Sequence, residues 1–212
     1  MTRVADIPAE TALLCEACGY THHAVEPAGN CPECGSPISQ SLPHLRQVPA
    51  WEERRGIGAV TGWLGTSVHA LFQPGGFFRR LALPGDIRRS RHFRWTHHAI
   101  AAVLLGVAGS IHADRFGLFI WQLSRIGEGA FAMAATTTVF VLASYLLLAG
   151  ITILVARLSA WEAAYRGLRL PRPVVDRAMD YHAVHLLPPS MTGLVITAGY
   201  AILERRHPTL AG

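Results

Sequence analysis

The sequence predicts an all-α polytopic membrane protein, with about three transmembrane helices, an interfacial amphipathic helix and a small N-terminal zinc-ribbon module. Half of the 212 residues are hydrophobic and the mean hydropathy is +0.27, which is high for a soluble chain. Long apolar segments fill the second half, whereas all four cysteines lie within the first 34 residues. The expected organisation is a ribbon at 1–40, a linker at 41–55, an amphipathic helix with an arginine-rich anchor at 56–95, a transmembrane domain at 96–203 and a tail at 204–212.

The cysteines form two matched pairs with metal-ligand spacing. Cys15-x-x-Cys18 and Cys31-x-x-Cys34 are each followed by glycine, which permits a tight turn after the second ligand. Four thiolates at this spacing predict a closed tetrahedral site that holds a structural Zn²⁺, with rubredoxin-like iron as the weaker alternative. Thiolate ligands favour a reducing compartment, and the first fourteen residues contain no signal peptide. His22 and His23, between the pairs, are expected to be solvated turn residues.

An amphipathic helix is predicted at 56–72, ahead of the first span. Its apolar residues recur at helical spacing, while Gly, Thr, Ser and His occupy the other side; the apolar set is Ile57, Val60, Leu64, Val68 and Leu71. The helix carries no charged residue, and Arg pairs at 54–55 and 79–80 flank it. Phe77 and Phe78 follow a Pro-Gly-Gly break beside those arginines, a pattern typical of the membrane interface.

Three apolar segments, at about 96–113, 129–156 and 184–203, are long enough to cross a bilayer. The third contains Pro188-Pro189, which predicts an irregular first turn. Nine arginines lie between Arg46 and Arg94 and five between 157 and 181, but only two between 114 and 128. The positive-inside rule therefore places the N-terminus and the 157–181 loop in the cytoplasm. Clustering of the arginines beside apolar runs favours lipid headgroups over nucleic acid as their partner.

The order of these elements resembles the Yip family of multi-span membrane proteins. The resemblance covers roughly residues 51–203 and rests on LFQPGGFFRRL, ILVARLSAWEAAYRG and YHAVHLLPPS. It implies a helical membrane domain, and a bacterial cytoplasmic-membrane location, because bacterial members often carry an N-terminal zinc ribbon. Eukaryotic members associate with Rab-type GTPases and vesicle traffic. The family usually has five spans, so we expect this chain to complete its bundle with a second copy or with other subunits.

The sequence predicts a non-catalytic scaffold or accessory subunit of a membrane complex. Two stripes of small residues indicate helix packing: Ala102, Gly106 and Ser110 in the first span, and Gly193, Thr197 and Ala201 in the third. The alternative is a haem- or metal-binding redox protein that uses His98, His112, His182 and His185. We expect no haem, because the second span lacks histidine. Asp176 and Asp180 add carboxylates near His182, although a solvated helix start explains them as well.

Overall fold

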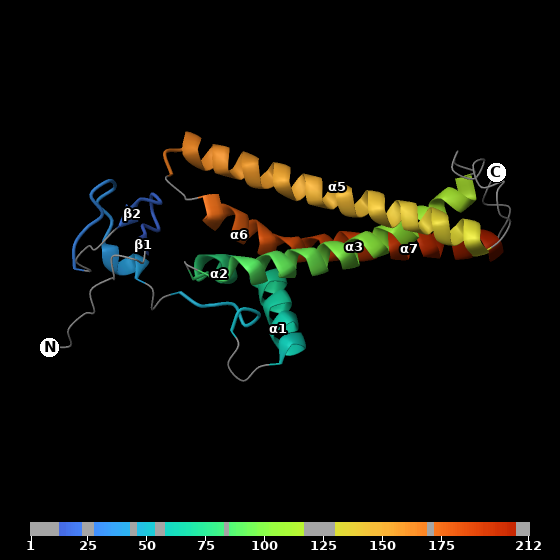
Figure 1. Ribbon diagram of the computed structural model, residues 1–212, viewed down its shortest axis with the longest axis horizontal. Helices are drawn as coiled ribbons and strands as arrows, with labels where there is room; N and C mark the ends of the chain where they lie inside the picture. The colour runs from blue at the N-terminus through green and yellow to red at the C-terminus, as the bar shows by residue number, and fades with distance from the viewer. Residues whose placement is uncertain are drawn as a thin grey trace. The chain divides into compact units, whose positions relative to one another are not determined.

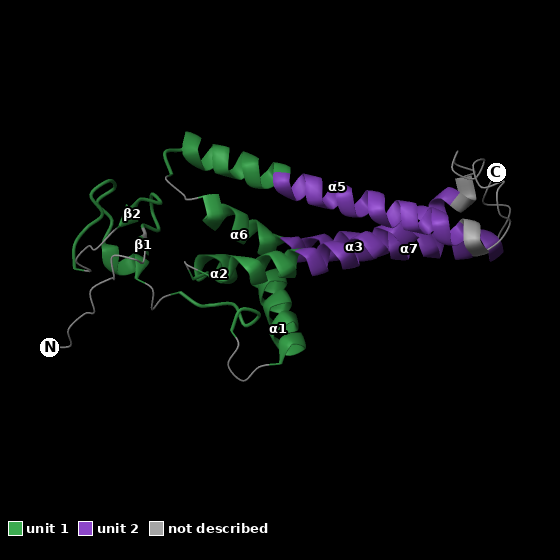
Figure 2. Ribbon diagram, in the orientation of Figure 1, with its two compact units in different colours: residues 1–94, 154–182 green, residues 95–153, 183–212 purple. Residues whose placement is uncertain are grey.

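The computed structural model describes residues 13–22, 28–42, 46–53, 58–82, 85–116, 130–168 and 172–206. These residues belong to two compact units, which Figure 2 colours separately. Unit 1 comprises residues 1–94 and 154–182, and unit 2 comprises residues 95–153 and 183–212. Some of the predicted features lie outside the described residues: His23, Arg54, Arg55, Ile57, most of the 114–128 loop and most of the tail.

The N-terminal module of unit 1 is a short hairpin followed by one helical turn (Figure 1). Strand β1 (Leu13–Leu14) pairs antiparallel with strand β2 (Thr21–His22). The 3-10 helix η1 (Ile38–Ser41) follows the second cysteine pair. The predicted ribbon is therefore present, with one cysteine pair in the hairpin turn and the other just before η1.

The apolar core of this module is very small. Among the described residues it consists of the buried Leu13 and Ile38, with Leu42 packed against them. A hydrogen bond of 3.0 Å from the amide of Glu16 to the hydroxyl of Ser41 links the hairpin turn to the end of η1. Because a module of this size buries too little apolar surface to fold by burial alone, it needs an additional cross-link.

The predicted amphipathic helix forms, and it turns its polar side towards the protein. Helix α1 (Ala59–Phe72) ends before helix α2 (Pro74–Arg79), which begins at the predicted proline break. The buried positions of α1 are small or polar: Gly62, Thr66, Ser67 and Ala70. Three residues of the predicted apolar stripe are exposed instead, Val60 at 72%, Leu64 at 49% and Val68 at 56%, and Leu71 is half-buried. Burial against unit 1 therefore does not account for the apolar side chains of α1.

Close packing between two long helices builds the core of unit 2. Helix α3 (Ile87–Phe116) and helix α5 (Ala130–Tyr165) meet at Ala101, Ala102 and Leu148. Further along, a Cβ atom placed on Gly106 would lie 2.4 Å from Cγ2 of Val141 and 2.7 Å from its backbone nitrogen. Only glycine permits this approach of the two backbones.

The last helical stretch runs from helix α6 (Arg172–His182) through the 3-10 helix η4 (Ala183–Leu186) into helix α7 (Leu187–Arg206). The irregular turn predicted near Pro188 and Pro189 is confirmed, because η4 directly precedes them. Proline cannot donate the backbone hydrogen bond that a continuous α-helix requires.

Three described helical stretches are long and apolar enough to cross a membrane: Ile87–Ala113, Met133–Tyr165 and Arg172–Arg206. This confirms the predicted fold class. The helices extend beyond the predicted spans, since α3 begins at Ile87 rather than near residue 96. A helix satisfies its own backbone hydrogen bonds, so it continues past the apolar segment into turns that carry arginine.

Candidate metal centre

The two cysteine pairs fold into turns of the same geometry. In the first, Gly19 donates its amide to the carbonyl of Cys15 at 2.9 Å, and the amide of Cys15 donates to the carbonyl of Tyr20 at 2.9 Å. In the second, Gly35 and Ser36 make the equivalent bonds with Cys31 at 2.8 Å. Gly19 and Gly35 have φ angles of 73° and 74°, in the left-handed region that favours glycine. Each turn thus places the sulfur atoms of its two cysteines on the same side of the chain.

The four sulfur atoms form one compact cluster. Cys15, Cys18, Cys31 and Cys34 place all their Sγ atoms within 4.8 Å of one another. The Sγ atoms of Cys15 and Cys34 are 3.6 Å apart, and those of Cys18 and Cys31 are 3.7 Å apart. A tetrahedral ion with metal–sulfur bonds of about 2.3 Å separates its ligands by about 3.8 Å, whereas a disulfide needs about 2.05 Å. The arrangement therefore fits a four-sulfur metal site.

The thiols of the cluster differ in acidity. The hydroxyl and amide of Ser36 donate to Cys34 and lower its pKa to about 6. The amide of Tyr20 lowers the pKa of Cys18, but loss of water and the three neighbouring thiols outweigh it and raise that pKa to about 12. Burial also raises the pKa of Cys15. Without a cation, four sulfurs this close cannot all ionise, because the thiolates repel one another.

His22 is buried in the module and is not the solvated turn residue that the sequence predicts. It is 1% exposed, and its ring packs edge-on against Tyr20 with ring centroids 5.3 Å apart. Burial lowers its pKa, because desolvation disfavours the charged imidazolium. Among the described residues, the cysteines are the only group of three or more ligating side chains that come together.

The four histidines of the redox alternative occupy different surroundings. His98 is buried in unit 2, where its Nε2 lies 3.1 Å from the hydroxyl oxygen of Thr152. That hydroxyl also donates to the carbonyl of Leu148 at 2.9 Å, so the contact with His98 belongs to a hydrogen-bonded group inside unit 2. His112 is exposed on α3.

The other two histidines lie near the α6–η4 junction. His182 is exposed and stacks on Phe78 with ring centroids 4.1 Å apart, whereas His185 is half-buried. The carboxylates predicted beside them diverge: Asp180 is 1% exposed, and Asp176 lies 4.0 Å from Arg172 on the surface of α6. The Asp and His residues of this segment thus have separate partners.

Asp180 joins a buried polar network in unit 1. Its carboxylate accepts a hydrogen bond from Ser90 at 2.7 Å and lies 2.8 Å from the guanidinium of Arg94. Both partners belong to the first turns of α3. This carboxylate has a structural role, because it ties α6 to α3.

Sequence reasoning missed a second buried ion pair in unit 1, between Glu52 and Arg177. Their side chains are 2% and 3% exposed, and the guanidinium contacts both carboxylate oxygens at 2.9 Å. Tyr181 donates to the same carboxylate, and the amide of Asp86 donates to it at 2.8 Å. The sequence predicts a linker at 41–55, but residues 46–53 pack within unit 1. The carboxylate of Glu52 fixes this segment in place, because a buried charge requires the hydrogen-bond donors that surround it. No local signal in the sequence connects Glu52 to a partner 125 residues away.

The two small-residue stripes differ in their surroundings. On α3, Ala102 and Gly106 are buried against α5, and Ser110 donates to a carbonyl of its own helix. On α7, a Cβ atom on Gly193 would meet nothing within 4 Å. Thr197 and Ala201 are half-exposed. The first stripe is used inside the chain, whereas Gly193 of the second has open space beside it.

Together, the fold and the cysteine cluster define a mainly helical polytopic membrane protein with an N-terminal four-cysteine module that could hold a metal ion. Comparisons of the chain with protein-family models, with curated proteins and with solved structures find no match.

Proposed function

We propose that this protein is a non-catalytic membrane scaffold or accessory subunit of a larger complex, with a ribbon that holds one structural Zn²⁺ in the cytoplasm. The observation that carries the proposal is the saturated four-sulfur cluster. When four thiolates fill a tetrahedral shell, no position is left for water or substrate, so the site supports folding or recognition rather than catalysis.

Zinc is the metal that these ligands favour. Thiolates select zinc or iron, and zinc takes the tetrahedral arrangement without any redox requirement. The ribbon's small core, built on Leu13 and Ile38, also needs the folding energy that a structural zinc ion supplies.

Zinc affinity should fall steeply as the pH falls. In the metal-free cluster the raised pKa values keep Cys15 and Cys18 protonated at neutral pH, and zinc must displace both protons. Displacing at least these two protons weakens apparent affinity by about a hundredfold or more for each pH unit lost. Below pH 6, Cys34 also becomes protonated, and the dependence steepens. Competition with a chromophoric chelator between pH 5.5 and 7.5 measures this, and a pH-independent affinity would contradict the assignment of ligands.

Arginines at the ends of the long helices support a three-span topology. They lie at the start of α3, at Arg157 in the C-terminal part of α5 and at the start of α6, which lie on one side of the membrane if each stretch crosses it. Arg205 and Arg206, in the last turn of α7, lie on the other side in this topology. By the positive-inside rule this side is the cytoplasm, and the ribbon lies there too. A bacterial cytoplasmic membrane and membership of the Yip family are the parts of this proposal that rest on the resemblance of residues 51–203.

Exposed apolar helices support association with lipid and with other subunits. In the most apolar 18-residue segments of Met133–Tyr165 and Arg172–Arg206, only 11% and 6% of the residues are buried. Lipid covers such surfaces but provides little net force between helices, so subunits associate through close packing of small residues.

Leucine substitutions at Gly106 and Gly193 should therefore have different effects. Gly106→Leu should destabilise the monomer, because Val141 already occupies that space, whereas Gly193→Leu should leave the monomer folded and weaken its association. Size-exclusion chromatography with light scattering in mild detergent, together with thermal unfolding, separates the two effects. Gly150→Leu is a matched control, since a Cβ there also meets nothing within 4 Å and the position is outside the stripe. If the wild-type protein is a lone monomer and Gly193→Leu behaves identically, the accessory-subunit proposal fails.

The redox alternative gains no specific support. Nε2 of His98 is engaged with Thr152, and the predicted absence of haem stays a prediction that an absorbance spectrum of the purified protein tests.

A further inference from the structure

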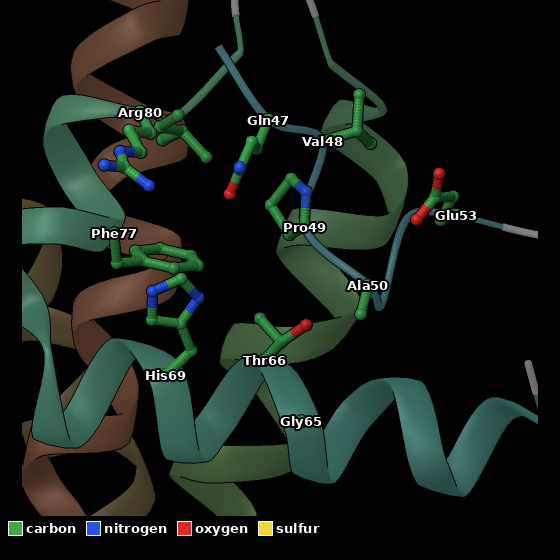
Figure 3. Close-up of a pocket in the computed structure, with 11 residues that line it drawn as sticks. Gln47, Val48, Pro49, Ala50, Glu53, Gly65, Thr66, His69, Phe77 and Arg80 are labelled. Carbon is green, nitrogen blue, oxygen red and sulfur yellow. The ribbon is translucent and has the colours of Figure 1, made fainter. Parts of the chain in front are cut away.

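A pocket lies beside α1 in unit 1, walled by residues 47–53, α1 and the end of α2 (Figure 3). Its volume is about 190 Å³, enough for roughly six waters at about 30 Å³ each. Pockets that enclose a whole drug-sized ligand measure about 300–1,000 Å³. This pocket therefore suits a small polar group whose remaining atoms stay outside.

Backbone hydrogen bonds hold the wall of the pocket in place. The amide of Gln47 donates to the carbonyl of Arg80 at 2.5 Å, and the amide of Ala82 donates to the carbonyl of Gln47 at 3.0 Å. On the other side, the amide of Trp51 donates to the hydroxyl of Thr66 at 2.9 Å. Because these bonds join the pocket's walls to one another, the pocket is formed before a ligand binds. Binding therefore costs little free energy for ordering the protein.

The charges of the pocket are separated. Arg80 and Glu53 lie on opposite sides of it in Figure 3, with Gln47 and Pro49 between them. His69 lines the side nearer Arg80, where its ring packs edge-on against Phe77 with centroids 5.5 Å apart. A ligand with an anion at one end and a cation at the other matches this arrangement.

The exposed stripe of α1 borders the pocket. Gly65 and His69 line the pocket, and each directly follows an exposed apolar residue, Leu64 and Val68. Consecutive residues on a helix are turned by about 100°, so the stripe and the pocket occupy neighbouring sides of α1. A group held in the pocket can therefore place an attached hydrocarbon chain along the stripe.

We propose that this pocket and the exposed stripe of α1 form a binding site for a zwitterionic phospholipid of the phosphatidylethanolamine class. Arg80 and His69 contact the phosphate, Glu53 contacts the ammonium group, and the acyl chains lie along Leu64 and Val68. The proposal depends on membrane insertion of the proposed scaffold, but it does not depend on the zinc site or on association with other subunits.

Native mass spectrometry of the full chain in mild detergent tests this site. Dioleoylphosphatidylethanolamine should bind about threefold to fivefold more tightly than the phosphatidylglycerol with the same chains, since one exposed ion pair distinguishes them. Glu53→Gln should bring the two affinities to within error of one another. Arg80→Gln should weaken both lipids by about fivefold.

Arg79→Gln is the matched control, because Arg79 is the exposed last residue of α2, directly before Arg80, and does not line the pocket. It should leave both affinities unchanged. Equal losses for Arg79→Gln and Arg80→Gln would show general attraction to a basic surface and would overturn the site. Tighter binding of phosphatidylglycerol by the wild-type protein would also overturn it. If soluble glycerophosphoethanolamine competes as well as the lipid, the ligand of this site is a free headgroup and not a phospholipid. If the wild-type protein is monomeric and still prefers phosphatidylethanolamine, the lipid site stands and only the accessory-subunit role is ruled out.

Discussion

Replacing Cys31 with Ser should abolish stoichiometric metal binding and unfold residues 13–42 while leaving membrane insertion intact. Cys31 is 2% exposed and its sulfur lies 3.7 Å from that of Cys18, so its loss opens the tetrahedral shell. Structural zinc binding contributes about 10–16 kcal/mol in small modules, far more than the few apolar residues of this one can supply. Elemental analysis and amide hydrogen exchange over 13–42 measure the two effects.

Ser39→Ala is the matched control, because Ser39 is exposed on η1 near the same cysteine pair. This variant should retain one zinc per chain and normal amide protection. Protected amides across 13–42 in the Cys31→Ser variant would contradict a folding role for the metal. Wild-type protein that contains disulfides instead of metal would contradict the site itself.

Replacing Arg177 with Ala should destabilise unit 1 by about 3–5 kcal/mol, because it leaves the carboxylate of Glu52 buried without a cation. The loss should be largest around residues 46–53 and the first turns of α3, which this carboxylate connects through Asp86. Thermal unfolding in detergent gives the overall change, and hydrogen exchange locates it.

Arg172→Ala on the same helix tests whether burial causes the effect. Arg172 is 68% exposed and lies 4.0 Å from Asp176, and an exposed pair of this kind contributes about 0–1 kcal/mol. A double variant, Glu52→Leu with Arg177→Met, should recover part of the lost stability, since it removes both charges from the interior. If Arg177→Ala is no less stable than Arg172→Ala, the buried pair has no special role in holding unit 1 together.

Local sequence patterns determined the features of this protein that arise from neighbouring residues. Two matched cysteine pairs followed by glycine predicted the four-sulfur cluster that could hold a metal ion, because such a turn is completed within five or six residues. Apolar runs predicted the three stretches that are long and apolar enough to span a membrane, because hydrocarbon requires a backbone that satisfies its own hydrogen bonds over that length. The proline pair predicted the irregular turn before α7 in the same way, since the missing donor acts on its own helix.

The tertiary structure alone decided which side of each element is buried and which distant residues form pairs. Periodicity identified the apolar stripe of α1, but only the packing of Gly62 and Thr66 against residues 50 and 51 exposed that stripe. Spacing identified two small-residue stripes, but only the approach of α5 distinguishes Gly106 from Gly193. Glu52 looked like part of a linker because its stabilising partner, Arg177, is remote in the chain. A buried charge is stable only beside its partner, and that partnership forms when the chain folds.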